Sequence, residues 1–177
     1  MPGPTPHPRL ATDRLILRPL TIADVAPMAA LLNDFEIARM VSRIPHPYAL
    51  DDAHAFLAHL QSVDPSRERG FALQSDTAGL IGVIGLDPRD DRATELGYWL
   101  GKPFWGRGYM TEAVRAVLEW VGGEWGRRFV VSRHFADNPA SGRVLTKAGF
   151  LYTGEVRQSC SLARREPVSS RMMVWLA

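Results

Sequence analysis

Trp105-Gly106-Arg107-Gly108-Tyr109-Met110-Thr111-Glu112-Ala113 is the stretch that decides the fold, because a short glycine turn runs straight into a helix. Two glycines at alternate positions permit backbone torsions that other residues avoid. Apolar residues then recur at helical spacing, at Val114, Val117, Leu118 and Val121. The first turn of a helix leaves N–H groups unpaired at the positive end of its dipole, so the stretch predicts a phosphate site. An ordinary glycine loop before a surface helix is the alternative.

Length and composition predict one domain with a substantial apolar core. The chain has 177 residues, of which 46% are hydrophobic, and we place the domain at residues 11–177. The prolines near the N-terminus predict a disordered or extended tail over residues 1–10. The formal charge of +2 gives no basic surplus for nucleic acid, which we do not expect as a direct partner.

Three further features concern the setting of the protein. Cys160 is the single cysteine, so no internal disulfide can form and a free thiol is the simplest role. No apolar run approaches the roughly 18 residues of a membrane span, and the N-terminus lacks the apolar core of a signal peptide. We therefore expect a cytoplasmic protein with no membrane partner. The histidines lack metal-binding spacing, so we expect no metal.

Hydrophobic periodicity and turn residues predict the order of elements along the chain. Strands are expected near residues 14–18, 70–74, 80–86, 93–100, 129–135, 150–157 and 171–176. Helices are expected at residues 21–32, from residue 51, after the glycine turn, and from Asn138 to Gly149. This order predicts an α/β fold with one mixed sheet of about seven strands and helices on both faces.

A glycine turn between a strand and a helix serves several kinds of site. A P-loop would need Lys and then Ser or Thr where Arg107 and Gly108 stand. A dinucleotide-binding fold would need a third glycine where Thr111 stands, and an acidic residue near the end of the next strand, which ends at Phe135. Both of these interpretations are therefore weak.

Three motifs follow one another along the chain: ELGYWL at residues 95–100, FWGRGYMTEA at residues 104–113 and NPASGRVLTKAGF at residues 138–150. Together they resemble the GNAT superfamily of acetyl-CoA-dependent N-acetyltransferases, in particular the ribosomal-protein N-terminal acetyltransferases. The resemblance covers almost the whole chain, from residue 12 to the final strand. It implies the GNAT fold, in which a mostly antiparallel sheet splays at a central parallel pair of strands, and acetyl-CoA as co-substrate.

The resemblance implies a cofactor loop at the glycine turn, whose backbone N–H groups bind the diphosphate of coenzyme A. The residues of this loop and the following turn are Trp105, Gly106, Arg107, Gly108, Tyr109, Met110 and Thr111. Trp105 stands where the family often has a polar residue, and Met110 replaces a small one. A Met110 side chain that points inward would reduce the room for the phosphates.

The strand before the loop resembles the family strand that binds the pantetheine arm of coenzyme A. Tyr98, Trp99 and Leu100 would line the gap between the splayed strands and pair with the arm through their backbone. The Leu100 N–H is the candidate donor that polarises the thioester carbonyl. Core packing is the alternative for Tyr98 and Trp99, and both roles are compatible because strand side chains alternate between faces.

Two residues are candidates for proton chemistry. Glu95 is the candidate base for the amine, directly or through water, because a carboxylate in an apolar strand holds a proton more readily than one in water. A surface or salt-bridged glutamate is the alternative. Leu145 stands where many relatives have a tyrosine acid. Ser141 is therefore the candidate donor to the departing sulphur, with assistance in helix capping as its alternative.

Asn138, Arg107 and Arg143 complete the candidate cofactor site. Asn138 is expected both to cap its helix and to contact pantetheine through its amide. The two arginines would meet phosphates of coenzyme A, with ordinary solvated arginines as the alternative. The acceptor site is expected between the two N-terminal helices and the loop at residues 43–48, with the last strands opposite.

The sequence therefore predicts an enzyme that moves an acetyl group from acetyl-CoA to a primary amine, by direct attack in a ternary complex. The family resemblance suggests a protein N-terminal α-amine as the acceptor. A small-molecule amine, such as an antibiotic, a polyamine or an amino acid, is one alternative. A non-catalytic CoA-binding sensor module is the other. A homodimer is an open option, since dimers are common in the family.

Overall fold

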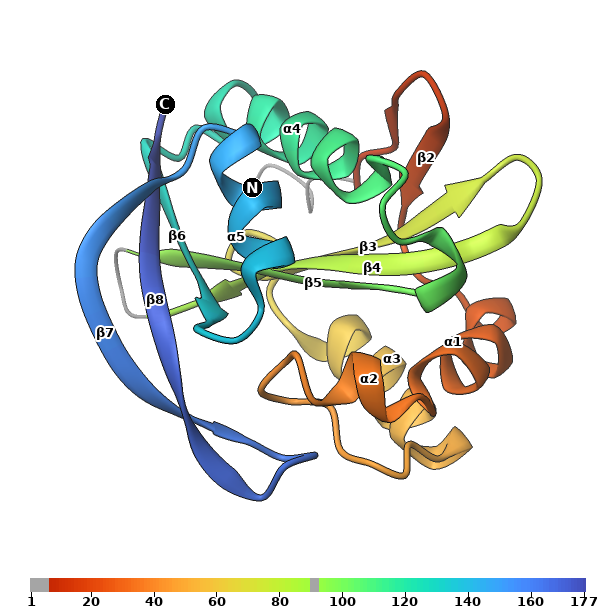
Figure 1. Ribbon diagram of the computed structural model, residues 1–177. Helices are drawn as coiled ribbons and strands as arrows, with labels where there is room; N and C mark the ends of the chain where they lie inside the picture. Colours follow the sequence, from red (N-terminus) through yellow and green to blue (C-terminus); the bar gives the residue numbers. More distant parts are fainter. Residues whose placement is uncertain (1–6, 90–92) are drawn as a thin grey trace.

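The structure is a computed structural model that describes residues 7–89 and 93–177, arranged around one twisted sheet (Figure 1). Its eight strands lie in the order β1-β2-β3-β4-β5-β6-β8-β7. Their bounds are Leu10–Ala11 for β1, Leu15–Arg18 for β2, Arg69–Ser75 for β3, Gly79–Pro88 for β4, Thr94–Leu100 for β5, Phe129–Phe135 for β6, Leu151–Ser161 for β7 and Glu166–Leu176 for β8. The predicted mixed sheet is confirmed, with one strand more than the expected seven.

The parallel pair, β5 and β6, lies inside the sheet and separates after a short contact. Two residue pairs join these strands, Glu95 with Val131 and Leu96 with Ser132. The Ser132 hydroxyl closes this contact by donating to the Leu96 carbonyl oxygen at 2.8 Å. Beyond it β5 continues through four more residues without a partner on the β6 side. The expected splay at the central parallel pair is thus confirmed.

Helices cover both faces of the sheet (Figure 1). α4 (Tyr109–Gly122) and α5 (Pro139–Lys147) lie on one face, and α1 (Val25–Leu32), α2 (Phe35–Ala38) and α3 (Leu50–Ser62) lie on the other. Two short 3-10 helices, η1 (Ile22–Asp24) and η2 (Lys102–Phe104), precede α1 and the glycine turn. Because strand side chains alternate, Phe71 and Leu73 join the core under α4, whereas Ala72 joins the core under α1 and α3.

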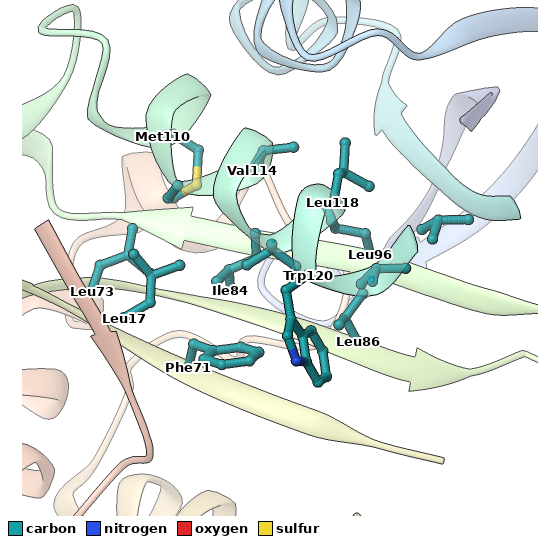
Figure 2. Packing of buried hydrophobic residues seen from close by; sticks show 14 of the residues in the cluster. Leu17, Phe71, Leu73, Ile84, Leu86, Leu96, Met110, Val114, Leu118 and Trp120 are labelled. Atoms are coloured by element: carbon teal, nitrogen blue, oxygen red, sulfur yellow. The ribbon is translucent and has the colours of Figure 1, made fainter. Parts of the chain in front are cut away.

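The core under α4 shows why the glycine turn is held firmly in place. Met110, Val114 and Leu118 recur every four residues and point from the helix onto the sheet, where Leu96 and Ile84 lie (Figure 2). Burying side chains of this size stabilises the fold by about 1.5–3 kcal/mol each. The helix therefore fixes the position of the turn that precedes it.

The extra strand β1 lies at the start of the described chain. Leu10 and Ala11 pair with Leu17 and Ile16, a contact too short to produce an alternating pattern in the sequence. His7 is also held, since its Nε2 donates to the Gly70 carbonyl oxygen at 3.0 Å. Of the tail predicted at residues 1–10, residues 7–10 therefore pack against the sheet, and residues 1–6 lie outside the described part of the chain.

The C-terminal hairpin is longer than the sequence indicated. The strands expected near residues 150–157 and 171–176 are parts of β7 and β8, each of which has 11 residues. β7 is an edge strand whose first eight residues are exposed, so polar side chains are tolerated there and hide the strand signal. No helix in the described residues is both long and apolar enough to cross a membrane.

Candidate active site

A cavity of about 940 Å³ runs along the splay between β5 and β6. At one end it is lined by the glycine turn and the start of α4, and at the other by α1, the segment after α2, and α3. The start of α5 and the unpaired half of β5 form its middle. The cavity therefore joins the predicted cofactor loop to the predicted acceptor region.

The glycine turn offers free backbone donors to this cavity. Gly106 and Gly108 have φ angles of 73° and 81°, which only glycine adopts without strain. Gly108 is the N-cap of α4, and no hydrogen bond from a described side chain caps this helix start. The first helical hydrogen bond runs from the Glu112 N–H to the Gly108 carbonyl oxygen. The N–H groups of residues 109–111 precede it, as an anion site requires.

A charged network holds the turn from outside. Arg14, in the β1–β2 turn, donates from Nε to Glu112 Oε2 at 2.8 Å and from Nη1 to the Arg107 carbonyl oxygen at 2.9 Å. Thr12 adds a hydroxyl bond to the same carboxylate at 2.5 Å. Burial alone would raise the pKa of Glu112, but the bonds from Thr12 and Arg14 outweigh it and lower the pKa. The Glu112 carboxylate thus stays ionised and fixes the glycine turn.

Met110 and Trp105, the two residues that depart from the family pattern of the loop, point to different surroundings. The Met110 side chain is only 4% exposed and packs in the core near Leu73 and Leu17 (Figure 2). Met110 also lines the cavity, and its effect on the room for the phosphates stays a prediction. The Trp105 indole donates to the Leu100 carbonyl oxygen at 2.7 Å and ties the turn to the end of β5.

The unpaired half of β5 presents backbone groups to the cavity. The Gly101 N–H donates to the Ile81 carbonyl oxygen at 2.8 Å, across the β4–β5 pair. Antiparallel pairs alternate, so in the unbroken β4–β5 register the backbone groups of Leu100 and Tyr98 turn away from β4. They face the gap that β6 leaves. The Leu100 N–H therefore has the orientation that its predicted role needs.

The side chains of this strand divide between the two faces. Trp99 is buried in the core under α1 and α3, as the packing alternative proposed. Tyr98 reaches across to α5, where its hydroxyl lies 2.8 Å from the Ser141 hydroxyl oxygen. Asn138 caps α5 by accepting the Ser141 N–H at 3.2 Å. The cap is therefore made by the Asn138 side chain, and the Ser141 hydroxyl is left to bond to Tyr98.

Glu95 lies on the wall of the cavity in a different setting from the one expected. It forms ion pairs with Arg89 and with Arg133, whose Nε lies 3.0 Å from Glu95 Oε1. The expectation of apolar surroundings is therefore wrong, and the salt-bridged alternative describes the resting state. The sequence could not show this, because Arg133 belongs to β6 and meets Glu95 only through the parallel pairing.

Two more carboxylates lie beside Glu95 in a row across the sheet. Asp87 is its direct partner on β4, and Glu68 comes opposite Asp87, because Arg69 pairs with Leu86. All three line the cavity. Each has a basic side chain beside it: His59 Nε2 lies 2.6 Å from Glu68 Oε1, Arg43 pairs with Asp87, and Arg89 and Arg133 pair with Glu95. Sequence analysis missed this row, since Glu68 directly precedes β3 whereas Asp87 and Glu95 belong to β4 and β5.

The tip of the β7–β8 hairpin closes the acceptor end. The Leu162 N–H donates to the Ser42 carbonyl oxygen at 3.0 Å, and Arg164 Nε donates to the Arg39 carbonyl oxygen at 2.7 Å. The Arg164 guanidinium also donates two hydrogen bonds to the Asp137 carboxylate, at 2.8 and 3.1 Å. These hydrogen bonds lower the pKa of Asp137. The last strands thus reach the acceptor region through this tip.

Two of the remaining predicted residues line the cavity and two do not. Arg143 and Thr111 line it, whereas the exposed Arg107 contributes its carbonyl oxygen to the network of Arg14. Position 145 of α5 holds a leucine and therefore no acid, and the Leu145 side chain is fully buried. Among the described residues, no group of three or more His, Cys, Asp or Glu side chains could hold a metal ion.

Comparison with known proteins identifies the fold and the family. The acetyltransferase (GNAT) domain family matches residues 14–151. The uncharacterised N-acetyltransferase YoaA of Bacillus subtilis (strain 168) is 29% identical over 155 residues, which cover 85% of this chain and 87% of the relative. The ribosomal-protein-serine acetyltransferase of Escherichia coli (strain K12) is 34% identical over 84 residues, which cover 45% of this chain and 46% of the relative.

A solved structure agrees with this assignment. That of RimL, a ribosomal-protein α-N-acetyltransferase in complex with coenzyme A, superposes with a TM-score of 0.84 at 16% identity, over 96% of this chain and 98% of RimL. At that identity the likeness shows the fold alone. The family match covers the glycine turn, the splayed strands and the start of α5, and it confirms the prediction of an acetyl-CoA-dependent N-acetyltransferase. The chain belongs to the acetyltransferase (GNAT) domain family.

Proposed function

We propose that this enzyme acetylates a protein N-terminal α-amine, with acetyl-CoA as the acetyl donor. The observation that carries the proposal is the continuous cavity, which joins the glycine turn to a second compartment at α1 and α3. The similarity to a ribosomal-protein-serine acetyltransferase supports this choice of acceptor. Direct attack in a ternary complex fits a cavity long enough for both substrates.

The residues of the splay have distinct tasks in this proposal. The N–H groups at the start of α4 hold the diphosphate, and the outward edge of β5 at Tyr98 and Leu100 pairs with the pantetheine arm. The Asn138 amide and the exposed Arg143 contact the same ligand. Acetyl-CoA supplies an activated acetyl group as a thioester. The Leu100 N–H stabilises the oxyanion that forms when the amine attacks, an effect worth about 2.7–4 kcal/mol for such a donor.

Glu95 remains the proposed proton acceptor for the amine. In the resting state both of its carboxylate oxygens are held by arginines, Oε2 by Arg89 and Oε1 by Arg133. Transfer through a water molecule therefore suits this carboxylate better than direct contact. Ser141 is proposed to donate a hydrogen bond to the departing sulphur.

The acceptor compartment combines an apolar wall with a row of ion-paired carboxylates. Met28, Leu32, Ile37 and Phe56 line it beside the carboxylate row of Glu68, Asp87 and Glu95. A peptide N-terminus fits this combination, since its ammonium group is drawn to the carboxylates and its first side chain covers the apolar wall. The carboxylate row also favours the second candidate, a small cationic amine such as a polyamine. We further propose that the enzyme acts in the cytoplasm, as a monomer or a homodimer.

Thermal unfolding with and without acetyl-CoA tests the cofactor assignment, and thiol release against a panel of acceptors tests the rest. A ligand at 100 times its dissociation constant stabilises the native state by about 2.7 kcal/mol, which gives a clear upward shift. If the coenzyme A thiol is released faster with N-terminal peptides than with polyamines, aminoglycosides or amino acids, the proposal is supported. The opposite order assigns a small-molecule acceptor, and binding without release on any amine supports a CoA-binding sensor.

A further inference from the structure

Two hydroxyl groups meet across the splay, one from each side. Tyr98 belongs to β5 and Ser141 to the first turn of α5. The Tyr98 hydroxyl lies 2.8 Å from Ser141 Oγ and 3.2 Å from the Ser141 carbonyl oxygen. Both residues line the cavity between the glycine turn and Glu95. This contact joins the cofactor strand to the helix that carries the proposed sulphur donor.

The surroundings restrict how the two hydroxyl protons can be arranged. The Ser141 backbone N–H is already taken by the Asn138 cap, so the position of Ser141 is fixed. Tyr98 is packed against the core under α4, and burial raises the pKa of its hydroxyl, an effect that the bond to Ser141 offsets only in part. The phenol therefore keeps its proton and can act as a donor. Its O–H has two acceptors within reach, Ser141 Oγ at 2.8 Å and the Ser141 carbonyl oxygen at 3.2 Å. When it donates to Oγ, the nearer of the two, the proton of Ser141 is free to point into the cavity.

We propose that Tyr98 is a positioning residue for Ser141: the Tyr98 O–H donates to Ser141 Oγ and directs the Ser141 O–H to the sulphur that leaves the acetyl group. This inference rests on the proposed function. It assigns to Tyr98 a task beyond lining the pantetheine site. Hydrogen bonds in a chain polarise one another, so the Tyr98 bond also makes Ser141 a stronger donor.

The chemistry balances without a net proton transfer from either hydroxyl group. The acceptor nitrogen forms a bond to the acetyl carbon, and the carbon–sulphur bond breaks with its electron pair on sulphur. The proton of the nitrogen leaves to Glu95 or water. Ser141 and Tyr98 keep their protons and stabilise the negative charge on sulphur by hydrogen bonding.

The test uses Tyr98→Phe, Ser141→Ala and the double variant. A hydrogen bond to a charged group corresponds to roughly 10- to 100-fold in rate, so each single variant should lose about that much kcat. KM for acetyl-CoA should stay within about threefold, and the double variant should be about as slow as Ser141→Ala alone, because the two groups act as one unit. Tyr152→Phe is the matched control, since it removes a tyrosine hydroxyl that bonds to His134 at 2.9 Å, and Tyr152 is not among the residues that line the cavity.

A spectroscopic measurement separates this role from a merely structural one. The ultraviolet absorbance of the bound coenzyme A thiolate is followed against pH in a Cys160→Ser background, which removes the exposed thiol of the protein. We expect the pKa of the bound thiol to lie below that of free coenzyme A, and Tyr98→Phe and Ser141→Ala to raise it toward the free value. Unchanged thiol titration in Tyr98→Phe, with coenzyme A still bound, overturns the inference.

Further outcomes keep the two proposals apart. If the unaltered enzyme neither binds acetyl-CoA nor acetylates any amine, the proposed function fails, whatever Tyr98 does. If it does both and Tyr98→Phe behaves like the control, the positioning role alone fails. Should Tyr98→Phe not fold, fluorotyrosine is placed at position 98 instead, because its phenol is more acidic and donates a stronger hydrogen bond. If the inference holds, this variant lowers the pKa of the bound coenzyme A thiol further than unaltered Tyr98 does, and an unchanged thiol pKa overturns it.

Discussion

Arg133 on β6 and Glu95 on β5 are joined by an ion pair of 3.0 Å at the point where the two parallel strands begin to part. The pair therefore lies at the entrance of the splay, between the cofactor strand and the acceptor compartment. A carboxylate at this place is well situated for the proton of an incoming amine, which is the task that we propose for Glu95.

Replacing Glu95 with Gln tests this assignment. The amide keeps the shape of the side chain but cannot accept a proton from the amine, so turnover should fall by about 100-fold or more. Binding of acetyl-CoA, measured by calorimetry, should change little because the glycine turn is untouched. Glu155→Gln is the control, since Glu155 is an exposed, ion-paired glutamate on β7. Turnover equal to that of the control would show that Glu95 is not the base.

The glycine turn provides a second prediction. Gly108 has a φ of 81°, and a Cβ added there would meet Arg14 Nη2 at 3.4 Å. Gly108→Ala should strain the backbone by about 1–2 kcal/mol and displace the N–H groups at the start of α4. We expect the dissociation constant for acetyl-CoA to rise about tenfold or more, equivalent to at least ~1.4 kcal/mol.

Gly79→Ala is the matched control for the strain itself. Gly79, the first residue of β4, has a φ of 67°, and a Cβ there would meet nothing within 4 Å. Thermal unfolding should show that Gly79→Ala loses about as much stability as Gly108→Ala, while the affinity of Gly79→Ala for acetyl-CoA stays unchanged. Equal affinities in the two variants would mean that the glycine turn does not bind the phosphates.

The parts of the site that the sequence could predict are the local ones. The glycine turn and the Asn138 cap depend on neighbouring residues, whose torsions and hydrogen bonds follow from residue type. The direction of the Met110 side chain stayed open because the helix register, which turns it into the core, is decided by packing on the sheet. The direction of a side chain at a helix start therefore needs the tertiary structure.

The contacts that sequence analysis missed are those made between strands. Asp87 stands opposite Glu95 only because β4 and β5 pair in one register, and a shift of one residue would turn the two carboxylates to opposite faces. The bond from Tyr98 to Ser141 likewise joins elements 43 positions apart in the chain. Pairing and packing over such separations leave no local pattern for a sequence to display.

A third prediction concerns stability and pH. The Asp24 carboxylate is buried and accepts two bonds from Arg18, at 2.7 and 2.8 Å. Burial alone would raise the pKa of Asp24, but the bonds from Arg18 and Thr21 outweigh it and hold the pKa below its usual value of 3.8. Since the folded state has the lower pKa, the ionised group stabilises the protein above the unfolded value, and this stabilisation is lost as the pH falls through the folded value.

Asp24→Asn should therefore lower the free energy of unfolding by about 3 kcal/mol at neutral pH, because Arg18 loses its charged partner. The difference from the unaltered protein should narrow as the pH falls from about 4 through the lower pKa of the folded state, below which the Asp24 carboxylate is protonated in both states. Urea unfolding at several pH values measures both effects. Asp13→Asn, at an exposed position, should stay within about 0.5 kcal/mol of the unaltered protein. A constant difference across the pH range would contradict the role of the Asp24 charge.

The last prediction separates the two possible effects of Met110. Its side chain is buried under α4, so Met110→Ala should leave a cavity in the core and lower the free energy of unfolding by about 2–5 kcal/mol. Affinity for acetyl-CoA, measured at a temperature where the variant is fully folded, should stay the same because the backbone donors are unchanged. Met110→Leu, which nearly conserves volume, should lose less than about 1.5 kcal/mol. If Met110→Ala instead bound acetyl-CoA more tightly, the side chain would be crowding the phosphates, contrary to its packed position.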